Sequence, residues 1–284
     1  MSVFRINPDS QQSLSAGERG FTLIELSIVL VIIGLIVGGV LVGQDLIKAA
    51  QIRATVTQLE RYNTAANTFR GKYNGLPGDL LNGVNFFASV ANQGTVAGAG
   101  NGDGLVQSVS AAGTTCAALN CEAGENLLFW YELNQASLIP DSTSSIVSYS
   151  NVTPVMGSTV LPNSKVGGQI GVQAAGGINY WVLANISGTD VAGVPTTGGG
   201  YAMSLSPIQA YQIDTKIDDG VPSTGTVITI LGGIPGTLND TVTSAAVNCG
   251  NSGTSAPTTA NDTAYNIATQ PNTVNCQLGI RTNF

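Results

Sequence analysis

A continuous apolar segment near the N-terminus limits what this chain can fold into. Residues 21–43 carry a single charged side chain, that of Glu25. A helix of this length rises about 1.5 Å per residue and reaches roughly 34 Å, which is enough to cross a bilayer once. We therefore expect a transmembrane helix over residues 21–43.

Two simpler interpretations of this segment fit less well. A secretory signal has an apolar core of about 7 to 15 residues followed by a small-residue cleavage site, whereas this segment is longer and contains a carboxylate. A plain uncleaved anchor does not explain Glu25. Placing a carboxylate inside a membrane segment costs free energy, so such a group by default indicates function. The segment is better interpreted as a device for assembly.

The residues around this segment resemble a known processing signal. The sequence GERGFTLIELSIVLVIIGLI consists of the end of a polar leader, a glycine, the run Phe-Thr-Leu-Ile-Glu-Leu and an apolar helix. It is similar to the N-terminal signal of type IV pilins and type II secretion pseudopilins over about residues 17–45. The resemblance implies that residues 1–20 are a leader. A prepilin peptidase would cut between Gly20 and Phe21 and methylate the new N-terminus.

The same resemblance gives Glu25 a role, because the glutamate at this position in the family serves filament assembly. Cleavage before Phe21 would place a new α-amino group near the depth of Glu25 on a neighbouring, staggered helix, and this amine would be its partner. One departure is visible, since many type IV pilins have a proline where this chain has Val42 between Gly39 and Gly43. Each glycine is less favourable in a helix than alanine by about 1 kcal/mol, so these residues could loosen the helix instead.

Beyond the apolar segment the pattern becomes amphipathic, over residues 44–73. Apolar residues recur there at spacings of three and four, which is typical of one helix face: Ile52, Val56, Leu59, Tyr62, Ala66, Phe69 and Tyr73. We expect the membrane helix to continue to Tyr73, with this stripe packed on the sheet of the head. Gly75 should cap its end, and Pro77 prevents continuation.

Residues 74–284 have the composition of a β-rich head. They are rich in Gly, Ser, Thr and Asn, which suits short strands and turns. The clearest strand is predicted over residues 178–187, and a further one within residues 221–231. The fold class is therefore α+β, with a long N-terminal helix, transmembrane in its first half, packed on an antiparallel β-rich globular head.

Two shorter helices and one turn are also predicted in the head. Residues 124–140 should form a helix that stops at Pro140 and packs its tryptophan into the core. Ser206 and Pro207 have the signature of a helix start, and Gly220 should end that helix. The N-G-D-G sequence at residues 101–104 is interpreted as a tight turn, because it lacks the full set of oxygen ligands of a calcium loop.

The four cysteines favour disulfides. An even number of cysteines in an exported chain indicates bridges rather than metal thiolates, and no histidine is present to complete a mixed zinc site. Three connectivities are open. We favour Cys116 with Cys121 and Cys249 with Cys276, because each joins near neighbours in sequence.

Composition argues against several classes of function. The absence of histidine excludes Ser-His-Asp and Cys-His nucleophile systems and H-E-x-x-H zinc sites. No phosphate-binding G-x-x-x-x-G-K-[ST] loop is present either. Residues 74–284 contain twelve acidic and three basic side chains, so the head is not expected to bind nucleic acid directly. We therefore expect no enzyme and no organic cofactor.

One metal site is conceivable. Asp214, Asp218 and Asp219 fall at the predicted C-terminal end of a helix, where the dipole disfavours negative charge, and Lys216 alone offsets them poorly. A hard cation such as Ca²⁺, also bound by carbonyl oxygens of the Gly220 turn, would suit this set. The alternative is a solvated acidic turn in which the Asp side chains cap backbone groups. Some secretion pseudopilins bind calcium, which favours the metal slightly.

Together these features predict a structural subunit precursor of a type IV pilus-like filament or a type II secretion pseudopilus. The expected partners are prepilin peptidase, copies of the chain and other pilins, an inner-membrane assembly platform and membrane lipid. Arg19 directly before the apolar segment places the leader in the cytoplasm and the head in the periplasm, before transfer to a pseudopilus or an extracellular pilus. Two alternatives stay open, namely a minor tip subunit or adhesin with a ligand-binding head, and an exported membrane-anchored enzyme.

Overall fold

The computed structural model describes residues 21–87, 100–107, 125–140, 161–186, 201–230, 249–250 and 263–284. The chain divides into two compact units, Met1–Ile47 and Lys48–Phe284. The leader and the pair Cys116 and Cys121 lie outside the described residues.

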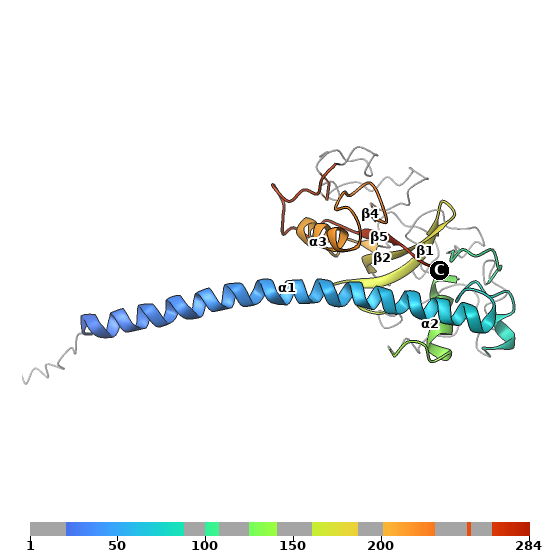
Figure 1. The fold of residues 1–284 in the computed structure, drawn as a ribbon, viewed down its shortest axis with the longest axis horizontal. Helices are drawn as coiled ribbons and strands as arrows, with labels where there is room; N and C mark the ends of the chain where they lie inside the picture. The colour runs from blue at the N-terminus through green and yellow to red at the C-terminus, as the bar shows by residue number, and fades with distance from the viewer. Residues whose placement is uncertain are drawn as a thin grey trace, which may run out of the picture. The chain divides into compact units, whose positions relative to one another are not determined.

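Helix α1 is a single element of 51 residues, Leu23–Tyr73, coloured blue to cyan in Figure 1. It ends where the sequence predicts, but the residue that turns the chain is Asn74 rather than Gly75. Asn74 has a φ of 57° and donates its N–H to the carbonyl of Arg70 at 2.9 Å. Asparagine tolerates this left-handed conformation and therefore can end a helix in place of glycine.

The part of α1 in the first unit is exposed on all sides. Every side chain of residues 21–42 is exposed, and the helix is long and apolar enough to cross a membrane. A Cβ atom added at Gly34, Gly38, Gly39 or Gly43 would meet nothing within 4 Å. Residues 21–42 therefore form an apolar stretch of helix whose side chains are all exposed.

The second unit is built on an antiparallel sheet with the order β1–β2–β5–β4. The hairpin of β1 (Gln169–Ala175) and β2 (Ile178–Ile186) turns through two glycines with positive φ, which suits a two-residue hairpin loop. Strand β5 (Leu278–Arg281) lies between β2 and β4 (Val227–Thr229), and the short β3 (Tyr201–Ala202) also pairs with β2. The expected α+β class with an antiparallel head is confirmed.

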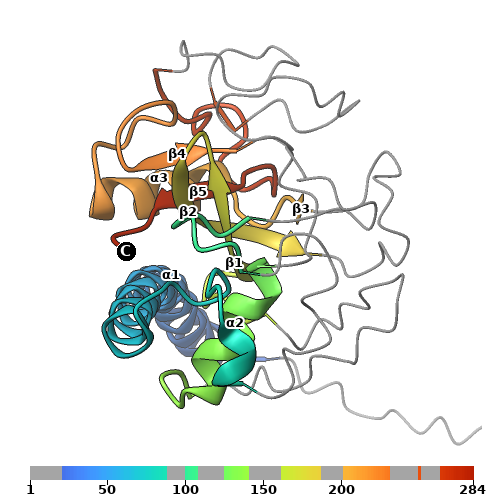
Figure 2. The ribbon, with the colours of Figure 1, turned by 90° about the vertical axis from the view of Figure 1, so that its right-hand side faces the viewer.

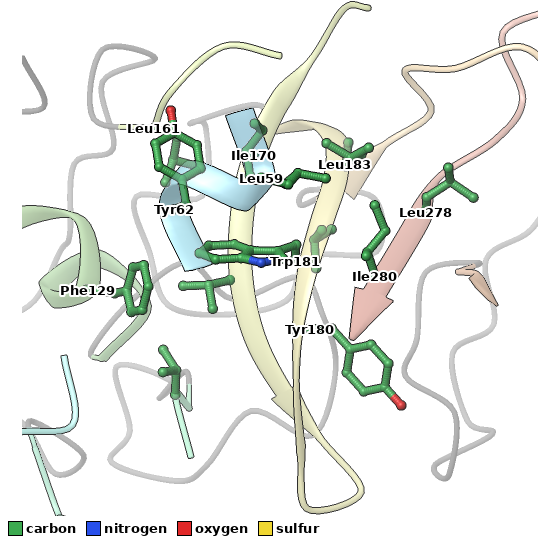
Figure 3. Packing of buried hydrophobic residues seen from close by; sticks show 14 of the residues in the cluster. Leu59, Tyr62, Phe129, Leu161, Ile170, Tyr180, Trp181, Leu183, Leu278 and Ile280 are labelled. Carbon is green, nitrogen blue, oxygen red and sulfur yellow. The ribbon is translucent and has the colours of Figure 1, made fainter. Parts of the chain in front are cut away.

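The second half of α1 and helix α2 (Glu125–Gln135) lie on one side of this sheet (Figure 2). Trp181 of β2 joins the three elements. Its ring centroid lies 5.9 Å from that of Tyr62 on α1 and 5.5 Å from that of Phe129 on α2 (Figure 3). Its indole Nε1 donates to Asn63 Oδ1 at 3.0 Å, so this buried polar atom is satisfied.

The buried face of α1 differs in part from the predicted stripe. Val56 and Tyr73 are only half-buried, whereas the polar residues Thr55 and Gln58 are buried. Gln58 Nε2 donates to the Tyr62 hydroxyl at 2.9 Å and to the carbonyl of Asn163 at 3.1 Å. A polar residue can therefore occupy the core face because the loop before β1 and a tyrosine on the same helix supply acceptors.

The two short helices begin close to the residues predicted from the sequence, but both end earlier than predicted. Helix α3 (Pro207–Ile217) begins with a capping box between Ser206 and Gln209. Helix α2 ends five residues before Pro140, at a turn in which Ser137 has a φ of 58°. The tryptophan of this helix, Trp130, is fully buried, as expected.

Candidate functional site

The start of α1 carries the residues on which the predicted function depends. Phe21 is 82% exposed, and Gly20 lies outside the described residues. The Glu25 carboxylate accepts the Thr22 backbone N–H at 2.8 Å and the Thr22 hydroxyl at 2.9 Å. The Thr22 Oγ1 in turn accepts the Glu25 backbone N–H at 3.3 Å. Thr22 and Glu25 thus form a reciprocal capping box.

This capping box adds Thr22 to the residues found from sequence. The pattern T-x-x-E at residues 22–25 is the usual signature of such a box, so Thr22 could have been identified before the structure was known. The box satisfies N–H groups that the first turn of a helix leaves without partners. It also orients the Glu25 carboxylate in the first turn of α1, close in sequence to Phe21, on a surface that is exposed throughout.

A family model described as the prokaryotic N-terminal methylation motif matches residues 15–41. The chain carries a prepilin-type signal. This signal supports the interpretation of the chain as a type IV pilin-like or pseudopilin precursor that prepilin peptidase processes. The apolar helix is consistent with a membrane-anchored pilin. Comparisons with curated proteins and with solved structures found no match.

The three carboxylates proposed for calcium do lie together at the end of α3. One carboxylate oxygen from each of Asp214, Asp218 and Asp219 lies within 4.8 Å of the other two. Oxygen donors at such separations fit a hard cation such as Ca²⁺. The same side chains also accept hydrogen bonds, as the alternative interpretation requires. Asp219 accepts the Val221 N–H at 2.8 Å and the Thr224 hydroxyl at 2.7 Å.

Asp214 is the buried member of this set. Its carboxylate accepts the Tyr265 hydroxyl at 2.8 Å and the Gly220 N–H at 3.2 Å. Burial raises the pKa of Asp214 to about 6, and the hydrogen bond from Tyr265 opposes this rise. Asp214 therefore ties α3 to the C-terminal segment, whether or not a cation binds beside it.

A disulfide closes that C-terminal segment. Cys249 and Cys276 are bonded, with their Cα atoms 5.1 Å apart and a sequence separation of 27. Cys276 also exchanges backbone hydrogen bonds with Leu205, which precedes α3. The bridge therefore fastens the segment that contains Tyr265 next to strand β5.

Proposed function

We propose that the chain is a structural subunit of a helical filament, either a type IV pilus-like fibre or a type II secretion pseudopilus. One observation supports this most strongly, namely that a methylation motif heads a helix whose residues 21–42 are all exposed. A continuous apolar surface of this kind requires lipid or other protein around it. Lipid surrounds it before assembly, and the same helix of other subunits surrounds it afterwards.

Glu25 directs the transfer between these two environments. The α-amino group of a processed Phe21 on a neighbouring subunit neutralises its carboxylate inside the apolar core of the filament. A charge without a partner in that core is unfavourable, so the pair selects one stagger between adjacent helices. The leader, which precedes Phe21, blocks this pairing until prepilin peptidase removes it.

The head lies in the periplasm while the subunit is in the inner membrane, with the basic Arg19 on the cytoplasmic side. An inner-membrane assembly platform receives the processed subunit and adds it to copies of itself and to other pilins. The head then covers the outside of the helical core. The fold and the motif support a structural subunit rather than an enzyme.

The proposal is tested by locating the chain in filaments from its own host. Filaments or pseudopili are isolated by shearing or from a strain that overproduces them, and subunit copy numbers are measured by quantitative mass spectrometry. Immunogold labelling along the whole fibre, with copy number proportional to fibre length, is the expected result. Label confined to fibre ends would instead support a tip subunit or adhesin. Fibres that lack the chain, while the processed chain accumulates in the membrane, would contradict the proposal.

A further inference from the structure

The sequence contains three Asn–Gly pairs, and each of the three asparagines, Asn74, Asn82 and Asn101, is exposed. Such pairs modify themselves, because glycine has no Cβ atom to keep its nitrogen from the asparagine side chain. The glycine nitrogen bonds to the side-chain carbonyl carbon, the Nδ2 group leaves as ammonia, and a five-membered imide results. Water then opens the imide on either side and gives aspartate or isoaspartate. The contacts around each pair therefore decide how fast it changes.

The pair Asn101–Gly102 lies in the loop of residues 100–107, and its attacking nitrogen is held by Asp79. The Gly102 N–H donates to Asp79 Oδ1 at 2.6 Å, and the Gly104 N–H donates to Oδ2 at 2.7 Å. Asp79 follows the turn after α1 and is only 2% exposed. Because both of its oxygens accept N–H groups, the geometry is that of an ionised carboxylate.

The group that would be attacked, the Asn101 side chain, is held as well. Its Oδ1 accepts the Asp103 N–H at 2.9 Å, and its Nδ2 donates to Asp103 Oδ2 at 3.0 Å. The Asn101 backbone N–H donates to Glu125 Oε1 on α2 at 3.2 Å. These contacts fix both the side chain and the backbone of Asn101, and so limit the rotation that bond formation requires.

The charge of Asp79 also opposes the reaction. The Gly102 nitrogen attacks after it loses its proton, and it then carries a negative charge that lies against the Asp79 carboxylate. Two like charges at hydrogen-bond distance repel, most strongly where water is excluded. A carboxylate is also too weak a base to take the amide proton itself, so Asp79 slows the first step and does not catalyse it. The same argument holds for Asp103–Gly104, which forms the same imide with loss of water.

The pair Asn82–Gly83 lacks this arrangement and serves as the comparison. The Gly83 N–H donates to the uncharged carbonyl of Leu80 at 3.1 Å, and the Asn82 side chain makes no capping hydrogen bond. Asn74 is a less direct comparison, because it adopts a left-handed conformation with a φ of 57°. The pairs share one chemistry, so a difference in rate between Asn101 and Asn82 reports on their contacts.

We propose that Asn101 is a latent self-modification site and that Asp79 is the positioning residue that keeps it unmodified in the folded head. Once Gly102 leaves Asp79, the imide forms and opens to aspartate or isoaspartate. An acid at position 101 would face the Asp103 carboxylate, to which the amide now donates, so the loop cannot return to its present contacts. The change is therefore irreversible and loosens loop 100–107 from the turn after α1. This inference goes beyond the proposed function and does not depend on it.

Peptide mapping of aged protein tests the proposal in the wild type. The full-length chain is incubated in detergent, either folded or unfolded by denaturant, and sampled over time. Aspartate and isoaspartate at the three asparagines are then measured by mass spectrometry after proteolysis. Because a hydrogen bond to a charged group has to break, Asn101 should change at least about tenfold more slowly in the folded chain than in the unfolded chain. Equal rates in the two states would overturn the proposal.

A matched pair of variants assigns the protection to Asp79. Asp79→Asn keeps one oxygen acceptor but loses the charge, so it should speed the change at Asn101 by about tenfold and leave Asn82 at its wild-type rate. Asp45→Asn is the control, since Asp45 is exposed on α1 and is also followed by leucine, and it should leave both rates unchanged. An unchanged rate at Asn101 in folded Asp79→Asn would overturn the role of Asp79. If Asp79→Asn does not fold, both rates rise together and the comparison in the wild type decides.

Discussion

The Glu25 carboxylate accepts two hydrogen bonds from Thr22, one from the backbone N–H and one from the hydroxyl. The group proposed to meet a neighbouring amine is therefore already oriented by its own helix. Glu25 therefore has two separate roles, the capping of α1 and the proposed pairing between subunits. A single substitution would not distinguish them.

Replacement of Glu25 by glutamine or by valine separates these roles. Glu25→Gln can still accept from Thr22, as in other capping boxes, but it carries no charge. Glu25→Val loses both the cap and the charge. We expect both variants to insert in the membrane and both to be nearly absent from filaments, as measured by comparing membrane and sheared fractions. Filament entry of Glu25→Gln at the wild-type level would show that the charge is not an assembly contact.

Thr22 should act on assembly only through its contacts with Glu25. Thr22→Ser retains the hydroxyl that bonds the Glu25 carboxylate and the Glu25 N–H, whereas Thr22→Val removes it while keeping a branched side chain. We expect wild-type filament yield for Thr22→Ser and a reduced yield for Thr22→Val, with processing at Gly20 unchanged. Equal yields from the two variants would contradict a role for the hydroxyl.

The bridge between Cys249 and Cys276 should contribute strongly to the stability of the head. We expect Cys249→Ser or Cys276→Ser to lower the free energy of unfolding by about 2–5 kcal/mol, as for native bridges in exported domains. Denaturant unfolding of the full-length chain in detergent measures this loss. The pair Cys116→Ser with Cys121→Ser is the control and should cost less, because it would open a shorter loop.

All four cysteines are predicted to be oxidised in the exported chain. Alkylation without prior reduction should therefore add no mass, and alkylation after reduction should modify four thiols. Four reactive thiols before reduction would contradict both pairings.

Calcium binding at Asp214, Asp218 and Asp219 is proposed from their shared position at the end of α3. A bound cation would stabilise the folded state, so excess calcium should raise the thermal midpoint by several degrees relative to chelator. Asp218→Asn removes one charge and should reduce the response, while magnesium provides the control for ionic strength. A thermal midpoint that responds to neither cation, in wild type and variant alike, would show that the three carboxylates only cap backbone groups.

The elements with strong local signals were predictable from sequence. Helix α1 combines an apolar run with spacings of three and four, and α3 begins with a serine, a proline and a glutamine at the capping positions. Strand β2 is rich in β-branched and aromatic residues and lies close to the predicted residues 178–187. In each case the local pattern and the tertiary environment favour the same structure.

The features that depend on distant contacts were not predictable. Strand β5 is only four residues long and follows a Thr/Asn-rich segment, and it is a strand because β2 and β4 pair with it from both sides. The carboxylates of Glu125 and Glu132 would be expected on the solvent face of a helix. They are buried because loop 100–107 and the turn after α1 bring N–H donors to them from far along the chain.

The mass of the mature chain, purified from its own host, shows whether the chain is processed as a pilin-like precursor. Processing by a prepilin peptidase should remove residues 1–20 and add one methyl group, so that the chain begins at N-methylated Phe21. Intact-mass spectrometry combined with N-terminal peptide sequencing determines both changes together. The expected result is a single species that lacks the leader and carries one methyl group on Phe21. A mature, membrane-inserted species that retains residues 1–20 would contradict the assignment as a pilin-like precursor.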